Sequence, residues 1–129
     1  MDTERAIFVY GSNLGGRNGR GAALTARLEY GARNGIGVGR NGHAYAIPTK
    51  SATLAVLPLD VIEEHVREFI AYARSHPELR FNVTRIGCGL AGYEDHQIGP
   101  FFRDAPDNCD LPQEWNHYVV RSNEYEQSP

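Results

Sequence analysis

The chain has 129 residues, of which 41% are hydrophobic and 22% are charged, and its formal net charge at pH 7 is −3. This composition is typical of one globular domain covering residues 1–129, and a negative chain lacks the basic surplus of broad nucleic-acid binders. The longest apolar runs, such as residues 54–57, are far shorter than the ~20 residues of a membrane span. No apolar signal segment follows Met1. We therefore expect a cytoplasmic protein without a membrane partner.

The cysteines and histidines do not form a recognisable metal or disulfide pattern. Cys88 and Cys109 belong to no C-x-x-C pair, and a cytosolic domain of this size needs no disulfide. The five histidines are scattered without the spacing of metal ligands. We therefore expect no metal, no cofactor and no disulfide.

The first third of the chain predicts a strand, a glycine loop and a helix. Residues 6–10 are an apolar, β-favouring run that ends at Gly11, as a buried strand would. Residues 11–21 are rich in glycine and asparagine and predict a loop. The apolar pattern that follows predicts a helix from Gly21 or Ala22 to about Tyr30, with Gly31 as its stop.

The middle third predicts a strand and a long helix. After a second glycine cluster at residues 35–42, residues 43–47 read as a strand that Pro48 ends. A loop at residues 51–58 leads to a helix that Asp60 can cap and that ends near residue 76. Its apolar face has helical spacing and consists of Ile62, Val66, Phe69, Ile70 and Ala73.

The last third predicts a strand at residues 80–86, a third glycine loop at residues 87–92 and a short helix at about residues 95–102. Beyond Asp104, Trp115 and residues 118–120 can pack back on the domain, and residues 124–129 are expected to fray. The whole order predicts an α/β fold.

Three loops follow predicted strands: residues 11–21, 48–50 and 87–92. Ligands of α/β sheets bind at the carboxyl ends of the strands, so these loops should gather around one site. Loop glycines let backbone N–H groups close on an anion, and the helix after the first loop adds a favourable dipole.

Each motif also allows a plain structural interpretation. The first loop lacks the spacing of a P-loop or of G-x-G-x-x-G and could be a flexible surface loop, and the second could be a turn that lets strand and helix pack. Tyr93 could provide a stacking surface for a ligand. As a ligand-binding pair, the two loops supply these candidates: Asn13, Gly15, Gly16, Asn18, Gly19 and Gly21 in the first, and Gly87, Cys88, Gly89, Leu90, Gly92 and Tyr93 in the second.

The candidates for chemistry are few. Lys50 is the only lysine and follows a strand end, although it could be a solvated surface charge. Asp95 and His96 could act as acid and base, or Asp95 could simply cap a helix. Cys88 could be a nucleophile, but nothing nearby in sequence activates it, and a small buried residue in a turn is the simpler interpretation.

Three segments together resemble the macrodomain superfamily: the glycine loop that opens a helix, the string Tyr-Ala-Ile-Pro-Thr-Lys ending at Lys50, and the string Ile-Gly-Cys-Gly-Leu ending at Leu90. The nearest branch contains the terminal ADP-ribose glycohydrolases and the ADP-ribose-1″-phosphate phosphatases. Residues 8–45 and 87–108 also look like short phage-associated macro-like proteins. The resemblance covers roughly residues 6–112.

The resemblance implies a three-layer α/β/α macro-like domain with a central mixed sheet. It implies that the first loop lies along the distal ribose and diphosphate of ADP-ribose and that the second loop faces it. In the glycohydrolase branch a lysine after the central strand attacks the distal ribose, and Lys50 matches that position. An acidic residue should follow Gly-Cys-Gly-Leu, but Ala91 stands there, with Glu94 or Asp95 as substitutes only if the loop folds back.

The chain also begins without the strands and acidic residue that often hold adenine in macrodomains. We therefore expect binding of ADP-ribose or a related NAD-derived nucleotide, free or on an ADP-ribosylated macromolecule, with possible hydrolysis of an ADP-ribosyl or ADP-ribose phosphate bond through Lys50 and Asp95 or His96. One alternative is a binding module without turnover, which Ala91 favours. Another is a phage interaction protein without nucleotide activity, which would expose an apolar patch around Phe101, Phe102 and Trp115.

Overall fold

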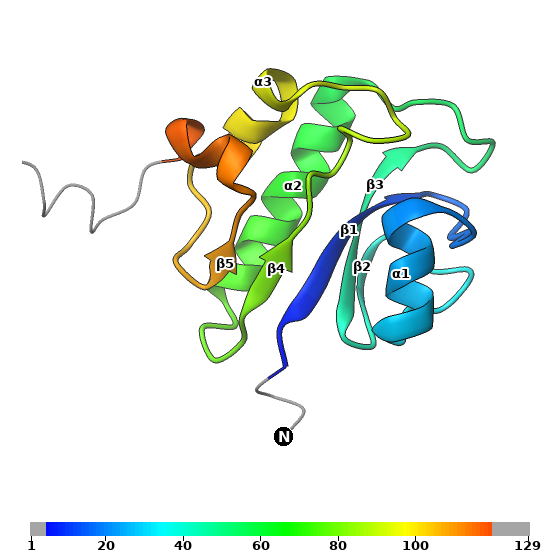
Figure 1. The fold of residues 1–129 in the computed structure, drawn as a ribbon, viewed down its shortest axis with the longest axis horizontal. Coiled ribbons are helices and arrows are strands. Elements are labelled where there is room, and N and C mark those ends of the chain that lie inside the picture. The colour runs from blue at the N-terminus through cyan, green and yellow to red at the C-terminus, as the bar shows by residue number, and fades with distance from the viewer. Residues whose placement is uncertain (1–4, 120–129) are drawn as a thin grey trace, which may run out of the picture.

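The computed structural model describes residues 5–119, so Val120 and the tail at residues 124–129 lie outside the described residues. A five-stranded sheet forms the centre, in the order β2-β3-β1-β4-β5 (Figure 1). The strands are β1 (Ile7–Asn13), β2 (Gly39–Asn41), β3 (Ala44–Lys50), β4 (Phe81–Val83) and β5 (Cys109–Asp110). All neighbours are parallel except β2, which runs antiparallel to β3. The predicted α/β fold with a mixed sheet is confirmed.

One face of the sheet carries helix α2 (Leu59–Arg74), together with α3 (Asp95–Ile98) and the 3-10 turns η2 (Gly99–Phe102) and η3 (Gln113–Tyr118). The predicted apolar face of α2 is the one that it buries, and Phe69 packs edge-on against Phe81 of the sheet with ring centroids 5.4 Å apart. A side chain of this size contributes about 1.5–3 kcal/mol when fully buried. This face therefore holds the larger part of the core.

The other face carries helix α1 (Gly21–Glu29), whose buried residues are Ala23 and Ala26. They pack with Ala44 and Ala46 of β3 and with the fully buried Tyr10 of β1. Small side chains on both surfaces let the helix lie close to the sheet. Figure 1 shows α1 and α2 on opposite faces, which completes three layers. Within the described residues, no helix has the length and apolarity needed to cross a bilayer.

Three strand ends differ from the predictions. β4 ends at Val83, not at residue 86, because its pairing with β1 stops there. β1 continues through Gly11 to Asn13 because Gly11 pairs with Ile47 in the parallel ladder. β3 continues through Pro48 to Lys50, so the prediction that Pro48 ends the strand is wrong. Pairing between β2 and β3 stops at Ala46, and the next bridge, from Lys50 to Val56, begins beyond Pro48. Pro48 thus lies in a gap between two pairings, where a residue without an N–H is tolerated.

Two further expectations need correction. Asp60 does not cap α2: Pro58 occupies the N-cap position and Asp60 lies in the first turn. The apolar patch that an interaction protein would show is not exposed, because Phe102 and Trp115 are fully buried and stack with ring centroids 4.9 Å apart. Phe101 is half-buried against the same core.

The second glycine cluster supports the first glycine loop. A Cβ added at Gly37 would lie 2.0 Å from the carbonyl oxygen of Asn13, and one at Gly16 would lie 2.3 Å from the backbone of Gly35. The hydroxyl of Ser12 also donates to the carbonyl of Gly37 over 2.5 Å. The two segments touch backbone to backbone, so these glycines fix the path of the loop that leaves β1.

Candidate functional site

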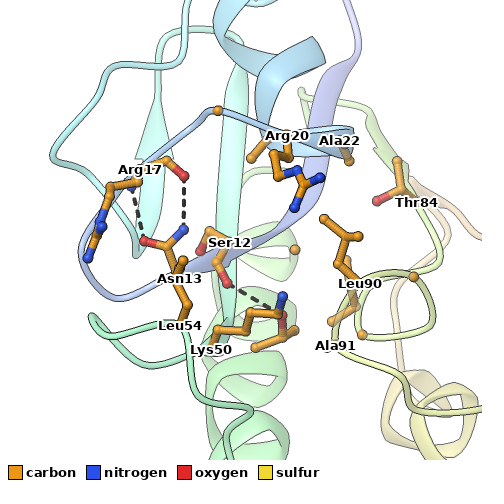
Figure 2. Close-up of a pocket in the computed structure, with 18 of the residues that line it drawn as sticks. Ser12, Asn13, Arg17, Arg20, Ala22, Lys50, Leu54, Thr84, Leu90 and Ala91 are labelled. Carbon is orange, nitrogen blue, oxygen red and sulfur yellow. Dashed lines mark hydrogen bonds between the residues drawn. The ribbon is translucent and has the colours of Figure 1, made fainter.

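A cavity of about 480 Å³ opens at the carboxyl ends of β1, β3 and β4. β1 lies between β3 and β4, so the connection from β1 leads to a strand on one side and the connection from β3 leads to a strand on the other. Ligands of α/β sheets bind at such a switch point. Figure 2 shows the two glycine loops on opposite sides of the opening. The walls are formed by Gly11, Ser12, Asn13, Arg17, Gly19, Arg20, Gly21, Ala22, Ala23, Thr49, Lys50, Leu54, Thr84, Arg85, Ile86, Gly87, Gly89, Leu90 and Ala91.

One wall presents backbone N–H groups from the start of α1. No hydrogen bond within the described residues uses the amides of residues 19–23, and all five residues line the cavity. The helix has no side-chain cap at Arg20 and no acidic residue in its first turn. Unpaired amides at a helix start carry partial positive charge. This wall is therefore suited to an anion.

The opposite wall presents a second set of amides. Loop 87–92 turns through Gly87 at a φ of 75°, and its own hydrogen bonds use the amides of Cys88, Gly92 and Tyr93. The amides of Gly87, Gly89, Leu90 and Ala91 have no acceptor among residues 5–119, and these residues line the cavity. Two sets of unpaired donors thus border one space.

The charged side chains of the walls are all basic: Arg17, Arg20, Lys50 and Arg85. Two of them are engaged, since Arg17 donates to the carbonyl of Ala52 over 2.6 Å and Arg85 binds Asp95. Arg20 and Lys50 have no side-chain partner in the described part of the chain. Figure 2 shows the Lys50 side chain ending in the open space between Ser12 and Ala91. No aspartate, glutamate or histidine is among the described lining residues.

The first loop is held in shape by its own asparagines. The Asn13 side chain accepts from the Arg17 amide over 3.0 Å and donates to the Arg17 carbonyl over 2.9 Å (Figure 2). The Asn18 side chain donates to the carbonyl of Arg33 and is 1% exposed. The Asn13 side chain is thus committed to the loop and borders the cavity as a structural residue, whereas Asn18 is buried outside the cavity and ties the loop to Arg33.

Asp95 does not line the cavity. Its carboxylate accepts two hydrogen bonds from Arg85, of 3.0 and 2.6 Å, and a third of 2.8 Å from the indole of Trp115. These donors, Arg85 first, lower the pKa of Asp95 to about 2. A carboxylate with this pKa and three donors stays ionised near neutral pH and is poorly suited to act as a general acid or base.

Cys88, Tyr93 and His96 also lie outside the cavity. Burial is the main cause that raises the pKa of the Cys88 thiol to about 12, and the nearby Asp95 adds to it, so the thiolate needed for nucleophilic attack is scarce. The Tyr93 hydroxyl donates to the carbonyl of Leu57 over 2.6 Å and anchors its loop. His96 is exposed and lies 3.7 Å from Glu94.

The cavity thus brings together part of the predicted set: Asn13, Gly19, Gly21, Lys50, Gly87, Gly89 and Leu90. It does not include Gly15, Gly16, Asn18, Cys88, Gly92, Tyr93, Asp95 or His96. The candidate site residues from the sequence also lacked several lining side chains, among them Ser12, Arg17, Arg20, Thr49, Leu54, Thr84 and Arg85. Thr84 and Arg85 could have been found as the first polar residues after β4, whereas nothing in the sequence marks Leu54.

The arrangement can bind a phosphorylated ligand through amides and cations, with apolar side chains beside the charged part. The chain matches no protein-family model, no curated protein and no solved structure in the three comparisons.

Proposed function

We propose that the cavity binds ADP-ribose or a related NAD-derived nucleotide through its phosphates, as a binding site without turnover. The observation that carries this proposal is the pair of unpaired amide sets, at residues 19–23 and in loop 87–92, on opposite sides of one cavity. Unpaired donors at the surface of a folded protein are satisfied by water or by a ligand, and two convergent sets suit the oxygens of a diphosphate.

The charges at the site support an anionic ligand. Arg20 and Lys50 face the cavity without a counter-ion in the described residues, although the whole chain is negative. A cavity lined by cations and by the amides of a helix start attracts an anion, and no acidic side chain among the described lining residues opposes it. Its volume, about 480 Å³, lies in the range of pockets for small molecules and cofactors.

Two glycines support a ligand in this space. Gly19 and Gly89 both line the cavity, and a Cβ added at either would meet no atom within 4 Å. Neither has a left-handed φ, so the fold itself does not require glycine at these positions. The missing side chains leave room for a group to approach the backbone closely.

The residues do not support hydrolysis through a lysine and a carboxylate. Ala91 lines the cavity where the resemblance to macrodomains asks for an acidic residue, and Asp95 is occupied by Arg85 and Trp115. Lys50 then acts as a cation for the phosphates and not as half of a catalytic pair. A binding module, the first alternative from the sequence, is the function we favour.

Titration calorimetry with ADP-ribose, with Ala22→Pro as the variant, tests the proposal. Proline at the second residue of α1 removes one unpaired amide without breaking a helix hydrogen bond, and we expect affinity to fall roughly 10- to 100-fold, the value of a hydrogen bond to a charged group. Asp60→Pro removes the amide at the same position of α2, away from the cavity, and should leave affinity unchanged.

Gly89→Ala gives an independent test if a proline disturbs α1. It should preserve the melting temperature while weakening binding, because its methyl group occupies space that the ligand needs. Absence of binding by the unaltered protein, or equal affinity of Ala22→Pro and the unaltered protein, would refute the proposal. Release of ADP-ribose from an ADP-ribosylated substrate, or of phosphate from ADP-ribose-1″-phosphate, would refute the lack of turnover.

A further inference from the structure

Leu54 has a backbone conformation that leucine rarely adopts. Its φ is 70°, and it is the only non-glycine residue with positive φ among residues 5–119. The left-handed region costs an L-residue roughly 1–2 kcal/mol because Cβ approaches the following carbonyl oxygen. A glycine or asparagine would fit this position more easily. The conformation therefore needs support from the surrounding loop, and the choice of leucine at this position needs an explanation.

The strain is held in place by a tightly bonded loop. The amide of Leu54 donates to the carbonyl of Ser51 over 3.0 Å, and the amide of Ser51 donates to the carbonyl of Ala55 over 2.7 Å. The Ser51 hydroxyl accepts from the amides of Thr53 and Ala55. Arg17 fastens the loop to the other side of the site through the carbonyl of Ala52. The loop thus presents Leu54 in one fixed position.

Packing inside the protein does not explain the leucine. Its side chain is 48% exposed and lines the cavity. Leu90, in the second amide loop, is 63% exposed and lines the same cavity. Figure 2 shows the two leucines on opposite sides of the opening, with Lys50 between them. Two aliphatic side chains therefore flank the cationic centre and lack cover in the free protein.

We infer that Leu54 and Leu90 hold the nucleoside end of the ligand, with the faces of the base or sugar against their side chains. This inference rests on the proposed phosphate-binding function, and it adds which part of the ligand the apolar side chains contact. Aliphatic side chains recognise a flat surface by burying it and do not read its hydrogen-bonding edge.

The same contacts define a class of ligand. Three hydroxyl side chains line the cavity, and each donates to a backbone carbonyl of the protein: Ser12 to Gly37, Thr49 to Ser12 and Thr84 to Val9. The site therefore recognises a nucleoside diphosphate group with little selection of the base. ADP and GDP should bind within about threefold of each other, since edge recognition that would discriminate them is worth far more.

Leu54→Gly tests the inference by separating stability from binding. Glycine relieves the left-handed strain, so the melting temperature should stay the same or rise. The affinity for ADP should fall about tenfold, the effect of losing the burial of much of one leucine. The affinity for inorganic pyrophosphate, which shares the phosphates and lacks the nucleoside, should change less than twofold.

Leu90→Ala should weaken ADP binding in the same selective way, and Leu28→Ala provides the control. Leu28 is 66% exposed on α1 and does not line the cavity, so its truncation should leave both ligands unaffected. Equal losses for ADP and pyrophosphate in Leu54→Gly, or no loss for either, would overturn the inference while leaving phosphate binding intact. Failure of the unaltered protein to bind either compound would instead overturn the proposed function itself.

Discussion

Lys50 and Arg85 are two cations that flank the same central strand and behave differently. Lys50 is the last residue of β3 and Arg85 follows the end of β4, on opposite sides of β1. Both line the cavity. Arg85 is held by two hydrogen bonds from its guanidinium to Asp95, whereas Lys50 has no partner in the described residues.

The difference shows that two cations at the same sheet edge can have different roles, depending on whether an acidic partner is present. Two parallel hydrogen bonds fix the geometry of an arginine–carboxylate pair. The carboxylate also balances the charge of the arginine, so the pair attracts a further anion only weakly. Asp95 also accepts from Trp115, which ties the pair to the core under α3. The cation that follows β4 is therefore part of a structural ion pair, whereas the cation that ends β3 has no partner in the described residues.

Removing Trp115, which anchors the Arg85–Asp95 pair, should have the largest effect on stability. Trp115→Ala removes a fully buried side chain that stacks on Phe102, and the free energy of unfolding should fall by about 3–5 kcal/mol. Urea denaturation measures this loss. Trp115→Phe keeps much of the packing and removes only the N–H donor to Asp95, so its loss should be smaller. A loss below 1 kcal/mol for Trp115→Ala would contradict this account of the core.

Neutralising the two cations should separate their roles in binding. Lys50→Met should reduce the affinity for ADP-ribose roughly 10- to 100-fold, because an unpaired cation gives a charge-assisted contact to phosphate. Arg85→Met should reduce it less than threefold, since its charge is already paired. Arg67→Gln, an exposed arginine of α2, provides the control. The comparison fails if calorimetry shows equal losses at residues 50 and 85.

The smallest expected effect concerns acid stability. The pKa of Asp95 is about 2 in the folded protein against an ordinary 3.8, so its ionised form stabilises the fold above about pH 4. That contribution is lost as the pH falls from about 4 toward 2. Asp95→Asn should therefore show a shallower fall in melting temperature over this window than the unaltered protein. Parallel curves for the two proteins would show that Asp95 does not link stability to pH.

Much of the fold could be predicted from local patterns. The apolar spacing of α2 identified the residues that it buries, and the apolar run at residues 6–10 identified the central strand. The strand ends could not be predicted, because they depend on neighbours. Pro48 lies in β3 between the last pair with β2 and the bridge from Lys50 to Val56, an arrangement that no local signal contains.

The site was predictable in outline and not in detail. Glycine loops after strands indicated where backbone donors would gather, and Lys50 lies between them as expected. The sequence could not show that Asp95 turns toward Trp115, because the two are brought together by the fold of residues beyond α3. It also gave no sign of Leu54, whose importance lies in an uncommon φ.

The contact between Gly37 and the carbonyl of Asn13 has a practical consequence for redesign of this protein. Because residues 35–37 support the first glycine loop from behind, the shape of that loop depends on residues that do not line the cavity. Variants made to test the proposed site should leave Gly16 and Gly37 unchanged and vary positions 54, 89 and 90. Substitutions there change the lining of the cavity, whereas a single methyl group at position 37 would collide with the backbone of Asn13 and distort the loop.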